Sequence, residues 1–249
     1  MVKLVSADHD RYVASVLLHP ADIAAARQLH ATVYKEKGWA GPIDLTDSGV
    51  LNDAFDPWHP LAVYFGVKDL HSGSDQLVVS GRMLDPGSLG ATALQTAAEC
   101  DILPELREEL ESSPPGTVVE ISGLAKAMRA NPTATLHLYR EMGVYSLRAG
   151  HRHWIMACDV TLSRKLSRLF GSSIDIVGHP SFLLGSTVVP MHSRIPEYFD
   201  RLINPSEEED PRTFTRRREF AAFLLERTPA EFLTPEGLLR RQLPEPRGS

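Results

Sequence analysis

The chain has 249 residues, of which 43% are hydrophobic and 23% are charged, and its formal net charge is −6. This composition is that of a globular protein, so it excludes a mainly disordered chain, a collagen and a coiled coil. The acidic balance argues against a general nucleic-acid binder, because such domains are usually basic.

Only two cysteines are present, and neither belongs to a CxxC or CxxH pair. This spacing argues against a zinc knot and against a disulfide framework, so we expect no resident metal. The apolar runs are too short to cross a bilayer, and no basic region followed by an apolar core opens the chain. We therefore expect a cytoplasmic protein without a membrane span.

The first part of the chain predicts a strand, a helix and a hairpin. A run rich in β-branched and apolar residues predicts a strand over 12–18, and apolar residues at helical spacing predict a helix over 21–37. Residues 39–60 are rich in proline, glycine, aspartate and asparagine, and a loop of that length is usually functional or mobile. Two further strand-like runs, 61–68 and 76–83, flank a polar turn and predict the hairpin.

The second part of the chain alternates between helical and strand patterns, which predicts an α/β fold around one mixed sheet. The expected helices are 89–100, 104–111, 133–148 and 161–170, and the expected strands are 118–124, 153–160 and two short ones within 173–190. An acidic joint at 204–211 precedes helical patterns over 214–227 and 235–241. We therefore predict one domain over 1–203 and a helical C-terminal appendage over 204–249.

Motifs of the common nucleophilic, zinc and nucleotide-binding chemistries are missing, since the chain has no GxSxG, HExxH, P-loop or GxGxxG. His151 and His153 lie two residues apart and share one face of a strand, either as ordinary strand-end histidines or as a metal pair. Cys158 lies in an apolar strand without an evident charged partner. That setting favours an inert buried thiol over a nucleophile.

Glu120 interrupts the apolar run of the strand predicted at the centre of the sheet. A carboxylate at such a position must be paired or carry a raised pKa. The residue is either half of a buried ion pair with an arginine or a general base or substrate anchor, and the two roles are compatible.

Asp53 and Asp56 lie three residues apart in the long loop, where they either cap turns or recognise a cationic or polar substrate head group. Arg82 ends the second hairpin strand. It is either a surface arginine or a partner that orders a cleft by pairing with Asp53, Asp56 or Glu120.

These residues, in this order, resemble the autoinducer synthase branch of the GNAT superfamily. That branch includes the acyl-homoserine-lactone synthases and the long-chain N-acyl amino acid synthases. Its pattern is an arginine on the first long helix, a tryptophan after it, a Glu-x-Asp-x-x-Asp loop, a strand-borne Gly-Arg and a Glu-x-Ser-Arg on the central strand. The matching positions, within residues 20–200, are Arg27, Trp39, Asp53, Asp56, Gly81-Arg82 and Glu120-Ile121-Ser122.

Two departures from the pattern matter. The chain has Leu51 where the first loop carboxylate would fall, and Gly123 where an arginine would follow the serine. In autoinducer synthases those positions help to bind or deprotonate the amine and order the cleft. Their loss argues for another acceptor, or for lost catalysis. The resemblance implies an acceptor site of Arg27, Trp39, Asp53, Asp56 and Arg82, with Glu120 as the base.

The resemblance also implies a GNAT-like sheet in which the parallel strands 118–124 and 153–160 splay apart and admit a pantetheine arm. The amine then attacks the thioester directly, so no nucleophilic serine or cysteine is needed, while a base takes its proton. Trp154, Met156 and Cys158 share one face of the second strand. They are either ordinary core or the wall of an acyl tunnel.

The donor site is implied to involve Ser122, Lys126, Arg129 and Thr133. The segment 126–133 contains no glycine, although CoA-using GNAT proteins usually hold the pyrophosphate with a glycine-rich loop. This favours the single phosphate of an acyl-carrier-protein arm. Basic residues at 164, 165 and 168, or at 216–218, would suit an acidic carrier protein, or are ordinary solvated helix faces.

The leading hypothesis is an N-acyltransferase that moves an acyl group, chiefly a fatty acyl group, from acyl-carrier protein or acyl-CoA to an amine. The acceptor would be an amino acid, an amino-acid derivative or a peptide N-terminus. No cofactor would be bound permanently, because the acyl thioester is a co-substrate. The alternatives are an acetyl-CoA-dependent acetyltransferase and a non-catalytic GNAT-fold binding protein.

Overall fold

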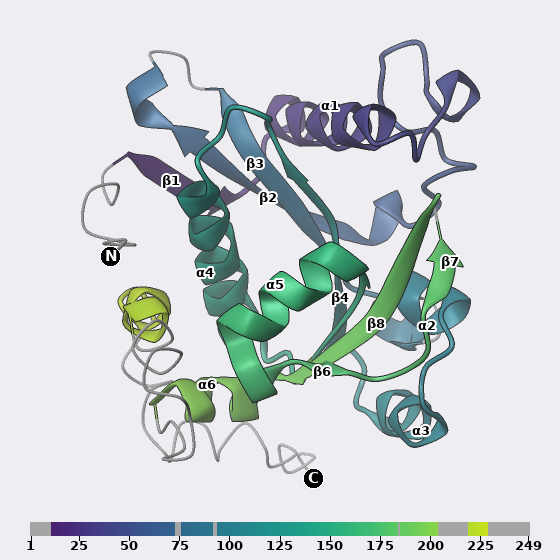
Figure 1. Ribbon diagram of the computed structural model, residues 1–249, viewed down its shortest axis with the longest axis vertical. Coiled ribbons are helices and arrows are strands. Elements are labelled where there is room, and N and C mark those ends of the chain that lie inside the picture. The colour runs from purple at the N-terminus through teal and green to yellow at the C-terminus, as the bar shows by residue number, and fades with distance from the viewer. Residues whose placement is uncertain (1–10, 73–75, 92–93, 184, 204–218, 229–249) are drawn as a thin grey trace, which may run out of the picture.

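The computed structural model describes residues 11–72, 76–91, 94–183, 185–203 and 219–228. Its centre is a mixed eight-stranded sheet in the order β1-β2-β3-β4-β5-β8-β6, with β7 paired to β8 (Figure 1). All neighbouring strands are antiparallel except β4 and β5, which are parallel. The mixed α/β architecture predicted from the sequence is therefore confirmed.

The strands fall close to the predicted runs, except near the end of the sheet. They are β1 (Tyr12–Val16), β2 (Ala62–Asp69), β3 (Leu77–Leu84), β4 (Val118–Lys126), β5 (His153–Asp159), β6 (Asp175–Ile176), β7 (Ser181–Leu183) and β8 (Ser186–Arg194). Two short strands were expected within 173–190, whereas the structure has three, and β8 runs on to Arg194. Pro190 concealed this long strand in the sequence, because proline inside an apolar run usually argues against a strand interior.

The helices follow their capping signals. They are α1 (Pro20–Glu36), α2 (Gln95–Glu99), α3 (Pro104–Ser112), α4 (Pro132–Ala149), α5 (Val160–Phe170) and α6 (Ile195–Ile203). Asn131 caps α4 by accepting a hydrogen bond from Thr133 N, and Gly150 ends it with a φ of 82°. Asp159 caps α5 by accepting a hydrogen bond from Thr161 N. Asparagine and aspartate are favoured caps, and glycine adopts the left-handed terminus without strain.

Two helical predictions need correction. A helix was expected over 89–100, but the described part of that segment becomes an α-helix only at Gln95, after Gly90 with a φ of 79°. Alanine-rich composition favoured a longer helix, but the backbone at this glycine is not helical. Helix α6 was not predicted at all.

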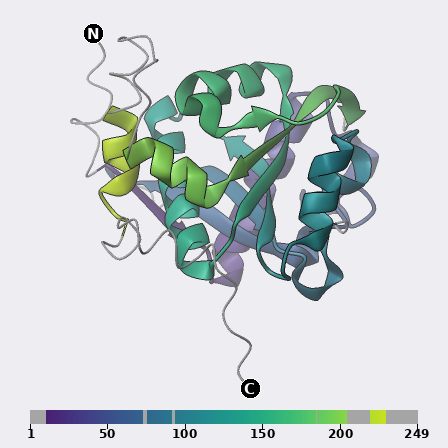
Figure 2. The ribbon, with the colours of Figure 1, turned by 90° about the horizontal axis from the view of Figure 1, so that it is seen from below.

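Helices cover both faces of the sheet (Figure 2). Alternate side chains of the strands point to opposite faces, so Met156 and Ile155 belong to different apolar clusters. The cluster of Met156 includes side chains from α4, α5 and α6, and the cluster of Ile155 includes side chains from α2 and α3. Helix α1 packs on the same side as α2 and α3, through a smaller cluster around Tyr64.

Residues 219–225 form a further helical segment, within the run predicted as a helix. Arg140 of α4 lies 4.1 Å from the Phe223 ring centroid and pairs with Glu226 at 3.1 Å. This segment thus contacts the outer face of α4. The acidic joint at 204–211 and the predicted helix over 235–241 lie outside the described residues, so the domain boundary remains a prediction.

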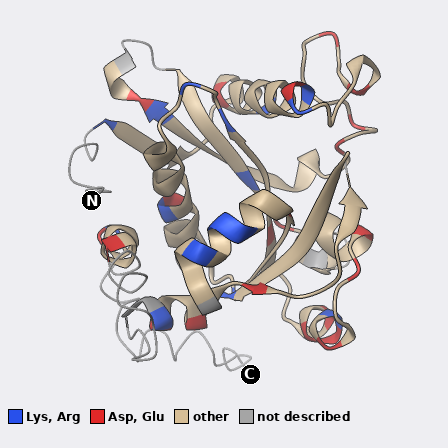
Figure 3. Cartoon of the chain, viewed as in Figure 1, with Lys and Arg blue, Asp and Glu red and all other residues tan. Residues whose placement is uncertain are grey.

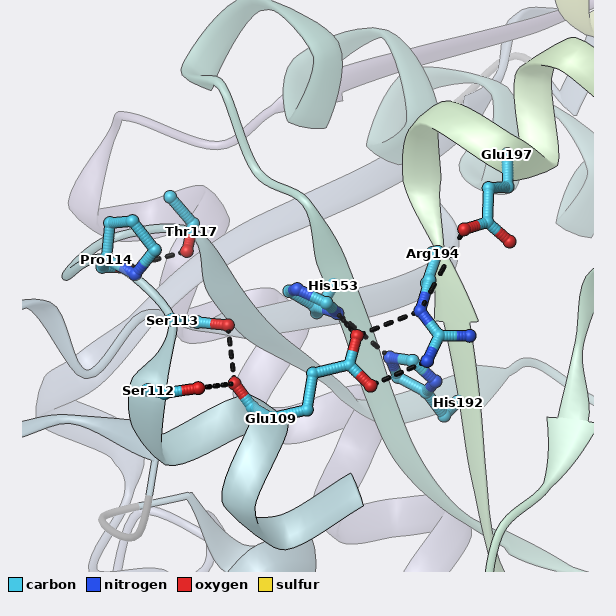
Figure 4. A network of polar contacts seen from close by, with 9 residues as sticks. All are labelled: Glu109, Ser112, Ser113, Pro114, Thr117, His153, His192, Arg194 and Glu197. Atoms are coloured by element: carbon cyan, nitrogen blue, oxygen red, sulfur yellow. Dashed lines mark hydrogen bonds and ion pairs between the residues drawn. The ribbon is translucent and has the colours of Figure 1, made fainter. Parts of the chain in front are cut away.

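A polar network joins α3 to the beginning of β5 and the end of β8 (Figure 4). Arg194 donates two hydrogen bonds to the Glu109 carboxylate, at 2.9 and 2.6 Å. His153 Nδ1 lies 3.1 Å from His192 Nε2, with the two rings stacked. Burial, together with repulsion from neighbouring cationic groups, lowers the pKa of His192 to about 3. This network lies where β5 begins, at the end at which β5 is paired with β4.

None of the described helices is both long and apolar enough to cross a membrane.

Candidate active site

Strands β4 and β5 separate halfway along their length. Parallel pairing joins Val118, Val119 and Glu120 to His153, Trp154 and Ile155, and it stops there. Both strands continue for several residues beyond this point. The splay that the fold prediction required is therefore present.

A bulge in β4 accompanies the splay. Arg82 of β3 faces Ser122, whereas Ser80 faces Ala125, so β4 has an extra residue in this stretch. Gly123 lies within it with a φ of 58°. A Cβ there would come within 3.2 Å of His30 and 3.3 Å of Arg82. The glycine found in place of the family's arginine is thus the residue that this backbone favours.

A cavity of about 110 Å³ opens between the separated strands. Its wall combines β4 and β5 with α1, α2, α5 and the β7–β8 hairpin. The lining residues are Tyr34, Trp39, Gln95, Glu120, Ile121, Ser122, Gly123, Leu124, Met156, Ala157, Cys158, Asp159, Leu162, Leu183, Ser186 and Val188. The lining combines polar side chains, such as those of Gln95, Glu120 and Ser122, with apolar ones, such as those of Leu124 and Met156.

Glu120 is 2% exposed and lines this cavity. Its Oε2 accepts a hydrogen bond from the backbone N–H of Thr96, at 2.7 Å. Burial raises the pKa of the Glu120 carboxyl to about 7, against the opposing effects of the Thr96 N–H and the Arg82 charge. A carboxyl with that pKa is suited to accept and release a proton at neutral pH. Among the described residues no arginine forms an ion pair with Glu120, so the expected pair is not found there.

The two loop aspartates lie in different environments. Asp56 is buried and accepts a hydrogen bond from Arg82 Nη1 at 2.6 Å, and Arg82 is itself 3% exposed. Arg82 Nη2 also donates to Ser122 Oγ at 3.4 Å. Asp53 is exposed. The cleft-ordering pair anticipated for Arg82 therefore forms with Asp56.

Aromatic side chains line the cavity where α1 ends and the loop over 39–60 begins. Trp39 meets Tyr34 edge-to-face at 5.2 Å between ring centroids, and Tyr34 meets His30 in the same manner at 4.2 Å. Arg27 lies outside the cavity lining and donates to the Leu51 carbonyl at 3.3 Å. Leu51, found where the family has a carboxylate, is 3% exposed and packs in a small apolar cluster.

A second, apolar cavity of about 20 Å³ lies beside the first. Both are lined by Ile121, Leu124 and Met156, and the second extends between α4, α5 and α6. Trp154 lines the second cavity and Cys158 the first, so the three predicted tunnel residues lie along one continuous wall. Burial raises the pKa of the Cys158 thiol to about 12, which agrees with the inert thiol.

The residues predicted for donor binding are scattered around the bulge and the beginning of α4. Of these four residues, only Ser122 lines either of the two cavities described above. Lys126 Nζ donates to the carbonyls of Ala127 and Ala130, at 3.3 and 2.9 Å. Arg129 is exposed, and Thr133 lies in the first turn of α4.

The exposed face of α5 is basic (Figure 3). Arg164, Lys165 and Arg168 are all exposed, and within the described part of the chain no ion pair neutralises them. The other basic run, 216–218, lies outside the described residues.

Some lining residues were not singled out in the sequence, notably Tyr34, Gln95 and Asp159. Tyr34 had a weak signal, since it precedes Trp39 at the end of the predicted helix. Gln95 had none, because α2 reaches the site through long-range packing. Among the described residues there is no group of three or more histidines, cysteines or carboxylates that could hold a metal ion.

No protein-family model and no curated protein sequence matches this chain. Several solved structures, however, match its fold. FeeM, an N-acyl amino acid synthase from uncultured soil microbes, matches with a TM-score of 0.58 and 19% identity, over 76% of this chain and 94% of FeeM. The AHL synthase LasI matches with a TM-score of 0.55 and 17% identity, over 74% of this chain and 90% of LasI.

A third match is BjaI, a CoA-dependent acyl-homoserine lactone synthase solved with SAM and isopentyl-CoA. Its TM-score is 0.53 at 14% identity, over 94% of this chain and 99% of BjaI. At these identities the likeness establishes the fold, which is that of the acyl-homoserine lactone and N-acyl amino acid synthases.

Proposed function

We propose that this protein is an N-acyltransferase that moves a fatty acyl group from a pantetheine thioester to an amine. The observation that carries the proposal is Glu120, a buried carboxyl with a pKa raised to about 7, at the wall of the cavity in the splay. The solved structures that share this fold are named as acyl-transferring synthases, which supports the reaction class.

The proposed reaction uses this geometry. The thioester arm lies between the separated strands, and the amine enters from the side of Trp39 and Tyr34. Glu120 takes one proton from the ammonium, directly or through water, and the amine nitrogen attacks the thioester carbonyl carbon. The carbon–sulfur bond breaks as the amide forms, and the leaving thiolate takes up the second proton that the nitrogen loses.

The second cavity favours a fatty acyl group over an acetyl group. An acetyl group ends near the splay, whereas a longer chain needs an apolar channel beyond it. Met156 lies between the two cavities, and its flexible thioether suits a passage that must adapt to its contents. The small volume of the second cavity requires the surrounding side chains to move when a chain enters.

The basic face of α5 supports acyl-carrier protein as the donor. The carrier is acidic, and the exposed cationic groups of Arg164, Lys165 and Arg168 would attract it over a short distance. Acyl-CoA needs no such face.

The function is tested by supplying purified protein with acyl-CoA and acyl-carrier protein of graded chain length and a mixture of amines. Free thiol and new amides are measured, the amides by mass spectrometry. We expect amide formation with chains well beyond acetyl, and loss of it in Glu120→Gln. Transfer of acetyl alone would identify an acetyltransferase, and a thermal shift with thioester but without turnover would identify a binding protein.

The donor is tested by reversing the charge of the α5 face. The Arg164→Glu, Lys165→Glu, Arg168→Glu variant should raise KM for acyl-carrier protein and leave KM for acyl-CoA nearly unchanged. Equal KM values for acyl-carrier protein in the variant and the wild type would contradict docking on this face.

A further inference from the structure

The first cavity has no lysine or arginine in its described lining, yet it has two carboxylates, Glu120 and Asp159. An acceptor with a free carboxylate beside its amino group would bring a third negative group into this space. Such a group needs a cation or several hydrogen-bond donors to compensate for its lost hydration.

Three cationic side chains on α1, β3 and β4 already have partners. Arg82 is held by Asp56 at 2.6 Å and is 3% exposed, so its charge is neutralised within the wall. Arg27 donates to the Leu51 carbonyl, and Lys126 donates to the Ala130 carbonyl. None of the three lines the cavity.

Histidine does not supply the missing charge. His30 lies beside Gly123 and is 4% exposed. Burial, together with the Arg82 charge, lowers the pKa of the His30 imidazole to about 3, so this ring is neutral at physiological pH.

The carboxylates of the lining are suited to an ammonium group instead. Burial raises the pKa of Asp159, but the Thr161 N–H and the Ser186 hydroxyl more than offset it, so the pKa is lowered and the group is ionised at neutral pH. Glu120 is partly ionised near its pKa of about 7. The aromatic rings of Trp39 and Tyr34 add surfaces that favour a cation.

We propose that the acceptor is an amine without a free carboxylate beside its amino group: an amino-acid amide or ester, a peptide N-terminus or a simple alkylamine. This inference rests on the proposed acyl transfer and restricts its acceptor. The ammonium binds between the aromatic rings and the carboxylates and loses one proton to Glu120. Its nitrogen then attacks the thioester carbonyl carbon, and the carbon–sulfur bond breaks as the amide forms. The nitrogen's second proton goes to the thiolate, which leaves as the thiol.

The experiment compares matched acceptors that differ only in the carboxylate. The first set is phenylalanine, phenylalaninamide and phenethylamine, and the second is leucine, leucinamide and isoamylamine. Thiol release from decanoyl-CoA gives kcat/KM for each at pH 8. Calorimetry without donor gives the affinity of each acceptor independently of turnover.

In whichever of the two sets reacts faster, we expect kcat/KM to be about tenfold or more higher for the amide and the alkylamine than for the free amino acid. The alkylamine is the decisive member. With a pKa of about 10.4 it has only a small free-amine fraction at pH 8, so its advantage cannot come from weaker basicity. Equal or better kcat/KM and affinity for the free amino acids would overturn the inference.

A charge variant tests the physical cause. Asp159→Asn keeps a side chain that caps α5 equally well, so the fold should persist. This variant should lower the ratio of kcat/KM for the amide to kcat/KM for the free amino acid by about threefold or more. The matched control Asp175→Asn removes an exposed carboxylate outside the lining and should leave the preference unchanged. An unchanged preference in Asp159→Asn would contradict the electrostatic cause.

The two hypotheses fail in different ways. If no acceptor is acylated, the transfer reaction is wrong, and the calorimetric comparison still decides which acceptors the cavity takes. If amides form only from free amino acids, the transfer reaction stands and the acceptor inference is wrong.

Discussion

The two ends of the β4–β5 pair hold a carboxylate in different environments, one partly exposed and one buried. At the paired end, Glu109 meets Arg194 in a two-bonded ion pair beside the histidines of Figure 4. At the splayed end, Glu120 has a single backbone N–H donor at 2.7 Å and faces a cavity. The partly exposed carboxylate with a matched guanidinium stays ionised and structural. Burial raises the pKa of the other carboxyl to near neutrality, which makes it available for chemistry.

The largest expected effect is that of Glu120→Gln. The amide preserves the shape of the side chain but cannot take the proton of the amine. We expect kcat to fall about 10²- to 10⁴-fold at neutral pH, with partial recovery as pH rises and more amine is free. The melting temperature should not fall, because burial opposes the charged carboxylate. Unchanged turnover in this variant would contradict the assignment of Glu120 as the base.

Asp56→Asn should be the most destabilising single change at the splayed end. It leaves the buried Arg82 without its charge partner, and we expect a loss of roughly 3 kcal/mol in the free energy of unfolding. Asp53→Asn is the matched control, and its effect should stay within about 0.5 kcal/mol, because the residue is exposed. Denaturant titration decides between them, and equal losses in both variants would contradict the buried-pair explanation.

Acid should destabilise the protein through histidines at both ends of the pair. His30 and His192 have pKa values lowered to about 3, so they stay neutral in the folded protein and take up protons only when it unfolds. Their contribution is complete above pH 6.5 and is lost as pH falls, at about 1.4 kcal/mol per pH unit for each histidine.

Glu120 opposes this acid loss. Its pKa is raised to about 7, so between pH 7 and 4.5 the folded protein holds a proton that the unfolded chain releases. Between pH 6.5 and 4.5 the loss in the wild type should therefore be smaller than in Glu120→Gln by about 1.4 kcal/mol per pH unit. The lowered pKa values of His59, His151 and His153 add to the loss in both proteins alike. Denaturant midpoints measured across this range test both slopes, and equal slopes would show that Glu120 is ionised throughout.

Met156→Trp should change chain-length preference at the splayed end. The larger side chain would block the passage to the second cavity and shift turnover towards shorter acyl chains. Ile155→Trp is the control, since it overpacks the opposite face of the same strand and should cost about 1–3 kcal/mol of stability without changing preference. If Met156→Trp lowers turnover for all chain lengths alike, the residue is ordinary core and not a tunnel wall.

The smallest expected effect is that of Glu109→Gln at the paired end. The Glu109 and Arg194 side chains are each about one-third exposed or more, so losing the pair should cost about 1 kcal/mol or less. Acyl transfer should persist, because neither residue lines either of the two cavities described above. A large loss of activity with normal stability would mean that the two ends are coupled.

Much of the fold was readable from the sequence because its signals are local. Periodicity located the hairpin of β2 and β3, the helix α1 and the strands β4 and β5 close to their observed bounds. The misses have local causes too, since Pro190 hid the length of β8 and alanine-rich composition extended α2.

For the site, the sequence alone determined that Glu120 is a carboxylate in an apolar central strand, because a single charge in such a run is visible without any partner. It could not decide that Thr96 holds this carboxylate, that Arg82 pairs with Asp56 and not Asp53, or that the strands separate after Ile155. Those outcomes depend on segments 24 or more residues apart meeting in one packed interior. There the surrounding groups, and not the residue itself, determine the protonation state of a side chain and whether it faces the cavity.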